Sequence, residues 1–113
     1  MAYDEKSAGR VSDIAFGWAG VDERKMFGGV GWLVNGNMCV GVWKEFLTLR
    51  VGKGTDEDLK KRRYVRDFDI TGNAMRGWVM VEPAGYKKKS DLVAYIELAK
   101  TFVDTLPAKV KNG

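Results

Sequence analysis

Two segments of the chain carry apolar residues at every third or fourth position, which is the spacing of one helix face. The first predicts a helix over about residues 4–19 that ends at Gly20. The second predicts the clearest helix, over about residues 91–106, with Ser90 as its N-cap and Pro107 after its end. Its apolar face consists of Leu92, Tyr95, Ile96, Ala99, Phe102, Val103 and Leu106.

Between these helices the pattern changes to the short apolar runs and alternation that are typical of strands. Runs over 30–34 and 37–43 flank Asn35-Gly36, a pair that favours a tight hairpin. A third strand over 46–51 follows, and its side chains alternate between two faces. We therefore expect an antiparallel meander of three or four strands.

A second group of strands is separated from the first by a brief helix. Thr55 is the expected N-cap of this helix, over about residues 56–63. Residues 66–70 and 75–82 then predict a second hairpin around Thr71-Gly72-Asn73-Ala74.

The strands come in consecutive runs instead of alternating singly with helices, which favours an α+β fold with an antiparallel sheet. We expect two layers, in which about five strands carry the helices on one face. The length of 113 residues fits one domain, which we place over residues 1–107, with 108–113 as a disordered tail.

The composition excludes several kinds of chemistry. Histidine is absent and Cys39 is the single cysteine, so neither a histidine-based catalytic centre nor a Cys- or His-rich metal site can form. We assign no catalytic residue, no metal site and no cofactor. Inside a strand run, Cys39 is expected to be a buried, unreactive thiol.

The chain also lacks the features of exported and membrane proteins. No apolar run approaches the roughly 18–20 residues of a membrane span. The N-terminal residues 1–5 are acidic and unlike a signal peptide, and a lone cysteine fits a reducing compartment. We expect a cytoplasmic protein with no membrane partner.

The glycines at 28, 29 and 31 do not form a phosphate-binding loop. They lack the spacing of that motif and the lysine that follows it, and they lead into a strand where a helix is required. Glycines at these positions are expected to permit a bulge or bend in a strongly twisted strand.

Four tryptophans are many for a chain of this length. Large aromatic residues also fill small cores, so about half of them are expected in the core. If Val79 and Val81 face the helices, Trp78 and Met80 lie on the opposite sheet face, where exposed apolar area marks an association surface. The candidate protein-binding residues are Trp32, Trp43, Trp78 and Met80.

The formal net charge of +4 is mildly basic. Candidate nucleic-acid-binding residues are Lys60, Lys61, Arg62, Arg63, Arg66, Lys87, Lys88 and Lys89. A simpler interpretation of the first run is that acidic residues 56–58 and basic residues 60–63 complement the dipole of the helix between them. Nucleic-acid binding requires both runs and Arg66 to meet on one face.

Several short motifs resemble the N-terminal domain of the TfoX/Sxy family of competence regulators. They are Arg24-Lys25-Met26-Phe27-Gly28-Gly29, Gly31, Gly36-Asn37-Met38, Leu47-Thr48-Leu49-Arg50 and Met75-Arg76-Gly77-Trp78-Val79. The resemblance covers about residues 4–107 and implies an α+β fold similar to secretion-chaperone-like and YjbR-like folds. In the competence regulators a second, helical domain follows this one, and the chain ends at Gly113 without it. The resemblance therefore implies a stand-alone domain and carries over neither transcriptional activation nor catalytic residues.

The leading hypothesis is a non-enzymatic binding or regulatory module that acts through a protein partner or a second copy of itself. A weak nucleic-acid-binding protein is the first alternative. An enzyme of unrecognised type is the second.

Overall fold

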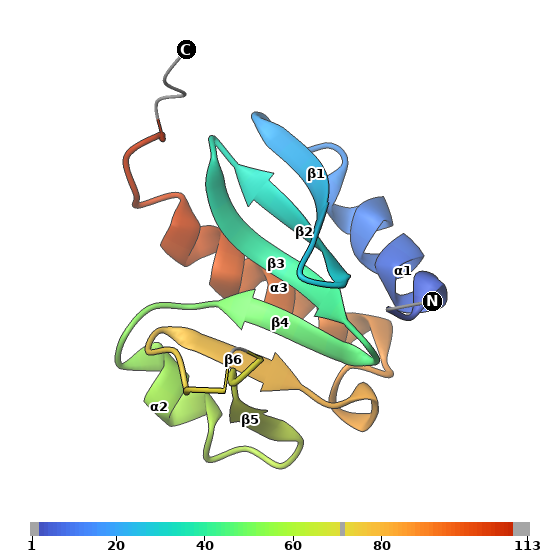
Figure 1. Ribbon diagram of the computed structural model, residues 1–113, viewed down its shortest axis with the longest axis vertical. Coiled ribbons are helices and arrows are strands. Elements are labelled where there is room, and N and C mark those ends of the chain that lie inside the picture. Colours follow the sequence, from blue (N-terminus) through green and yellow to red (C-terminus); the bar gives the residue numbers. More distant parts are fainter. Residues whose placement is uncertain (1–2, 71, 110–113) are drawn as a thin grey trace.

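The computed structural model describes residues 3–70 and 72–109, which form a six-stranded antiparallel sheet and three α-helices (Figure 1). The sheet has the order β1-β2-β3-β4-β6-β5, so that β6 is inserted between β4 and β5. The α+β class is confirmed, with one strand more than the five expected. The strands are β1 (Val21–Met26), β2 (Gly29–Val34), β3 (Asn37–Trp43), β4 (Phe46–Arg50), β5 (Val65–Asp67) and β6 (Trp78–Val81).

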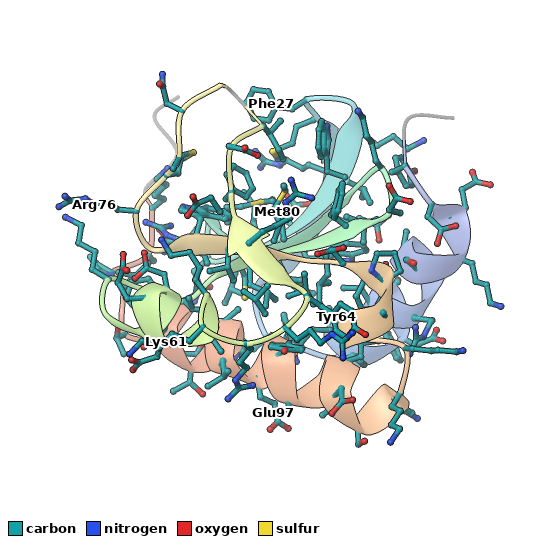
Figure 2. All side chains as sticks on the ribbon, turned by 90° about the horizontal axis from the view of Figure 1, so that it is seen from below. Phe27, Lys61, Tyr64, Arg76, Met80 and Glu97 are labelled. Atoms are coloured by element: carbon teal, nitrogen blue, oxygen red, sulfur yellow. The ribbon has the colours of Figure 1, made fainter. Side chains whose placement is uncertain are left out.

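The helices lie together on one face of the sheet (Figure 2). They are α1 (Glu5–Ala15), α2 (Thr55–Leu59) and α3 (Lys89–Val103), and a 3-10 turn, η1 (Pro83–Gly85), precedes α3. Both predicted N-caps are wrong, because α2 begins after Gly54 and α3 after Lys88. Within the described residues, no helix is long and apolar enough to span a bilayer.

The core fills the space between the sheet and the helices. Leu47 and Leu49 of β4 and Val79 and Val81 of β6 are fully buried there, as their alternation predicts. The pairing of β2 with β3 contains a bulge, in which Trp32 lies opposite Val40 and Leu33 lies opposite Met38. Cys39 is therefore the extra residue of β3, and it faces the core together with Val40.

The strand absent from the sequence prediction is β1, at the edge of the sheet. Its four central residues, 22–25, are all charged, and no apolar alternation marks them as a strand. The strand forms because its backbone pairs with β2 over six residues, from Val21–Val34 to Met26–Gly29. Charges on an outer strand also discourage pairing with other chains.

The β2–β3 turn anchors the end of the described chain. The Asn37 amide nitrogen donates to the Pro107 carbonyl oxygen at 2.9 Å, and the Lys109 backbone N–H donates to the Asn35 carbonyl oxygen at 2.8 Å. Lys109, which the sequence placed in the tail, therefore lies against this turn. The rest of the predicted tail, residues 110–113, is outside the described part.

Candidate functional site

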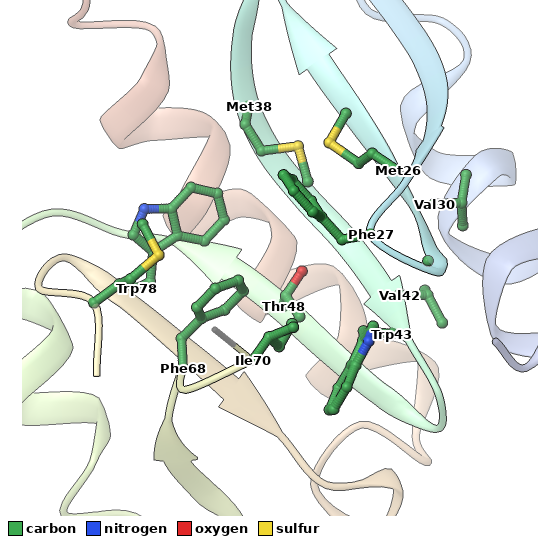
Figure 3. Close-up of a pocket in the computed structure, with 12 residues that line it drawn as sticks. Met26, Phe27, Val30, Met38, Val42, Trp43, Thr48, Phe68, Ile70 and Trp78 are labelled. Carbon is green, nitrogen blue, oxygen red and sulfur yellow. The ribbon is translucent and has the colours of Figure 1, made fainter. Parts of the chain in front are cut away.

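The sheet face opposite the helices contains an apolar pocket of about 370 Å³ (Figure 3). The β1–β2 hairpin forms one wall and the loop between β5 and β6 forms the other. None of the lining residues is charged, and a single side-chain hydroxyl, that of Thr48, is among them. The lining residues are Met26, Phe27, Gly29, Val30, Met38, Val42, Trp43, Thr48, Phe68, Ile70, Met75 and Trp78.

Two paired glycines in the middle of the sheet leave room for side chains that line the pocket. Gly31 of β2 lies opposite Gly41 of β3. A Cβ at Gly31 would come within 2.7 Å of the Met38 sulfur, and one at Gly41 would come within 2.7 Å of the Thr48 hydroxyl. Side chains there would fill the space that Met38 now occupies and displace Thr48 from the floor.

Aromatic pairs stand at two corners of the pocket. The Phe68 and Trp78 ring centroids lie 4.9 Å apart and tilted, and those of Trp43 and Phe46 lie 6.2 Å apart and stacked. Both tryptophans are half-buried and turn away from the helices, a face that was predicted for Trp78 alone. The contribution of Phe68 was missed, because the predicted strand over 66–70 included it, whereas β5 ends at Asp67 and Phe68 belongs to the loop that follows.

Phe27 is an exposed aromatic residue in an unfavourable backbone conformation. Its side chain is 80% exposed at the pocket wall, and its φ is +52°. With Gly28 (φ +77°) it forms the two-residue β1–β2 turn, where the glycine was expected to allow a bulge. The β2–β3 turn has the same signs of φ but uses Asn35-Gly36, the preferred pair. A bulky residue with positive φ is unusual and carries backbone strain.

A buried carboxylate fixes the base of the loop wall. Asp56 is 2% exposed and accepts backbone N–H bonds from Gly77 (2.8 Å), Gly54 (2.9 Å) and Glu57 (2.9 Å). Burial raises the pKa of Asp56, but these three donors outweigh it and hold the pKa below its ordinary value of 3.8. Because Gly77 precedes Trp78, the carboxylate ties the pocket wall to α2.

Two of the predicted protein-binding residues are not available at the surface. Trp32 is 2% exposed and belongs to the core, because it alternates with Gly31 and therefore faces the helices. Met80 lies on the pocket side of β6, as predicted, but it is 1% exposed. The surface prediction is thus wrong for Trp32 and Met80.

The two lysines of the first basic run form ion pairs, and its two arginines lie over aromatic rings. Lys60 forms ion pairs with Glu57 at 3.3 Å and with Asp67 at 2.9 Å. The Arg62 guanidinium lies over the Tyr95 ring, at 5.7 Å from its centroid. The remaining members follow the same pattern: Lys61 lies 3.8 Å from Asp58, and Arg63 lies over Tyr64.

The structure separates Arg66 from the other basic residues. The Glu82 N–H donates to the Tyr64 carbonyl oxygen at 2.8 Å, so the residue after the run 60–63 lies beside the segment that leads to the run 87–89. Arg66, however, follows the core residue Val65 and points to the pocket side of the sheet. The condition for nucleic-acid binding, one face that holds both runs and Arg66, is not met.

The thiol of Cys39 is expected to be unreactive in the folded protein. It is fully buried, and this burial raises its pKa to about 12. We expect its reaction with a disulfide reagent at pH 8 to be about 100-fold slower or more in the native protein than after unfolding. Equal rates in the two states would contradict this placement.

Comparison with known proteins agrees with the motif pattern. The model of the TfoX N-terminal domain family matches residues 14–103. Neither a curated protein nor a solved structure matches the chain. Among the described residues, no group of three or more Cys, Asp or Glu side chains is placed to hold a metal ion.

Proposed function

The chain belongs to the TfoX N-terminal domain family, and we propose that it is a non-enzymatic binding module whose pocket receives an apolar side chain of a protein partner. Family membership fits a competence-regulator-like domain. The observation that carries the proposal is the pocket itself, an uncharged hollow of about 370 Å³ on the sheet face without helices. Exposed apolar area of this kind is the usual mark of an association surface.

The composition of the pocket suits a protein side chain. Aromatic residues that line a partly desolvated hollow are typical of interface hot spots. The pocket is also lined by flexible, polarisable methionine side chains, which adapt to the shape of an occupant: Met26, Met38 and Met75. The partner is either another protein or a second copy of this chain.

Filling the pocket tests the proposal. Thr48 is 3% exposed on the pocket floor, so Thr48→Met projects a larger side chain into the hollow, whereas Thr48→Val keeps the original size. We expect Thr48→Met to weaken association about tenfold or more and Thr48→Val to leave it within about twofold. Self-association is measured by sedimentation equilibrium, and capture of partner proteins by quantitative mass spectrometry on the immobilised chain.

Thermal unfolding of both variants establishes that they are folded. If folded Thr48→Met retains every association of the wild-type protein, the pocket is not the binding site. If the wild-type protein sediments as a monomer and captures nothing beyond what Thr48→Met captures, the proposed function is wrong.

A further inference from the structure

A row of stacked side chains follows one border of the pocket. The Lys44 ammonium lies 4.7 Å from the centroid of the Trp43 ring, which stacks on Phe46, and the Arg66 guanidinium lies 5.4 Å from the centroid of Phe46. The row therefore places two aromatic rings between two cations. Trp43 belongs at once to this row and to the pocket lining.

The Trp78 corner carries a third cation. The Arg50 guanidinium lies 5.9 Å from the Trp78 centroid and 6.0 Å from that of Phe102. A guanidinium that lies over a ring keeps the N–H groups at its edge directed outward, where they can bind a carboxylate. The uncharged pocket is thus bordered by cations whose side chains are already held in place.

These three cations have no acidic partner among the residues that the structure describes. No carboxylate oxygen there lies within 4.0 Å of Lys44, Arg50 or Arg66. The acid next to Arg66 in the sequence is occupied, since Asp67 pairs with Lys60 at 2.9 Å.

Two further carboxylates belong to the segments that border the pocket. Glu45 is in the β3–β4 turn and Asp69 is in the loop wall, and neither forms an ion pair with the three cations. Both carboxylates reduce the positive charge of the border.

On the basis of the proposed function, we propose that the partner segment is acidic. One apolar side chain of this segment enters the pocket, and the Asp or Glu residues on either side of it pair with Lys44, Arg50 and Arg66. Electrostatic complementarity of this kind selects the partner more than it adds affinity. A basic segment would place like charges against the border and be excluded.

A nucleic acid also combines negative charge with rings that stack on aromatic residues. The pocket is poorly suited to a base, because the lining offers one hydroxyl and no charged or amide side chain to the polar edges of a base. A partly acidic, partly apolar protein segment matches both the border and the hollow.

Three peptides test the inference, each acetylated and amidated: Glu-Asp-Phe-Leu-Glu-Asp, Ser-Gln-Phe-Leu-Ser-Gln and Lys-Arg-Phe-Leu-Lys-Arg. Binding is followed by the change in intrinsic tryptophan fluorescence, since Trp43 and Trp78 line the pocket, at low and at 0.5 M NaCl, with decathymidylate as a fourth probe. We expect the acidic peptide to bind about tenfold more tightly than the neutral one at low salt, since about three exposed charge pairs supply that factor. The basic peptide should bind most weakly, and high salt should remove the difference.

Matched variants assign the preference to the border. We expect Lys44→Glu with Arg66→Glu to abolish the preference for the acidic peptide. Two equal charge changes on the helix side, Lys87→Glu with Lys88→Glu, should leave it within about twofold, because both residues are exposed and directly precede α3.

The outcomes separate the two proposals. If the neutral peptide binds as tightly as the acidic one, and Thr48→Met abolishes both, the pocket binds apolar side chains and the acidic preference is wrong. Tighter binding of decathymidylate than of the acidic peptide would also overturn the inference. If no peptide binds, both the acidic preference and the proposed function fail.

Discussion

Replacing Asp56 with alanine should lower the free energy of unfolding by about 3 kcal/mol. The substitution removes a charged acceptor from three backbone N–H groups, one of which, that of Gly77, belongs to a buried hydrogen bond. Hydrogen bonds to charged groups contribute about 1.5–3 kcal/mol each, and buried donors left without a partner add their desolvation cost. Urea unfolding, followed by circular dichroism, measures the change.

Asp58→Ala is the matched control in the same short helix. The Asp58 side chain is 81% exposed, and its carboxylate lies 3.8 Å from the Lys61 ammonium. Exposed pairs of this kind contribute little, so a change below about 0.5 kcal/mol is expected. Similar losses in the two variants would show that Asp56 stabilises the protein only through general helix electrostatics.

The same carboxylate predicts a pH dependence. Because the folded-state pKa of Asp56 lies below 3.8, its stabilisation is complete above that value and is lost as the pH falls through the lowered pKa. Asp56→Asn keeps one acceptor oxygen but cannot titrate. The stability gap between wild type and Asp56→Asn should therefore be constant from pH 7 to about pH 5 and narrow below about pH 4. A gap that widens with acid would contradict the assignment.

Replacing Phe27 with asparagine should change stability and binding in opposite directions. Asparagine accepts a positive φ more readily than a bulky residue, and the exposed ring gives up little burial, so a gain of about 1 kcal/mol in unfolding free energy is expected. Loss of an aromatic group from the pocket wall should weaken binding of the acidic peptide about tenfold. Urea unfolding and the peptide titration measure the two effects on one preparation.

The reciprocal control is Asn35→Phe. Asn35 is exposed and has a φ of +51°, so phenylalanine there should cost about 1 kcal/mol and leave peptide binding unchanged. If Phe27→Asn destabilises the protein, the aromatic residue is retained for the fold. If it stabilises the protein without weakening binding, Phe27 takes no part in recognition.

The fold was predictable wherever one side of an element is buried. Leu47 and Leu49 were assigned to the core from their period of two, and residues 91–106 were assigned to a helix from their period of 3.6, close to the observed α3. The strand β1 was not predictable in this way. It forms through backbone hydrogen bonds at a sheet edge, which place no requirement on its side chains.

The candidate site was predictable only in part. Alternation within one strand placed Trp78 on the face without helices, and it left the face of Trp43 open. The opposite wall depends on residues 68–70 and 72–77. Asp56 holds the end of this wall at Gly77, 21 positions away in the sequence, and no local pattern indicates such a contact. A pair of glycines that face each other across two strands, Gly31 and Gly41, was the available signal of a hollow.

The hydrogen bonds that hold Pro107 and Lys109 against the β2–β3 turn decide how the protein should be tethered for measurement. That turn is at the end of β2 opposite to Phe27 and Gly28, about 20 Å away along a six-residue strand. A linker joined beyond Lys109 would start from that far corner. A sensor surface or bulky fluorophore carried by the linker would then leave the mouth of the pocket unobstructed.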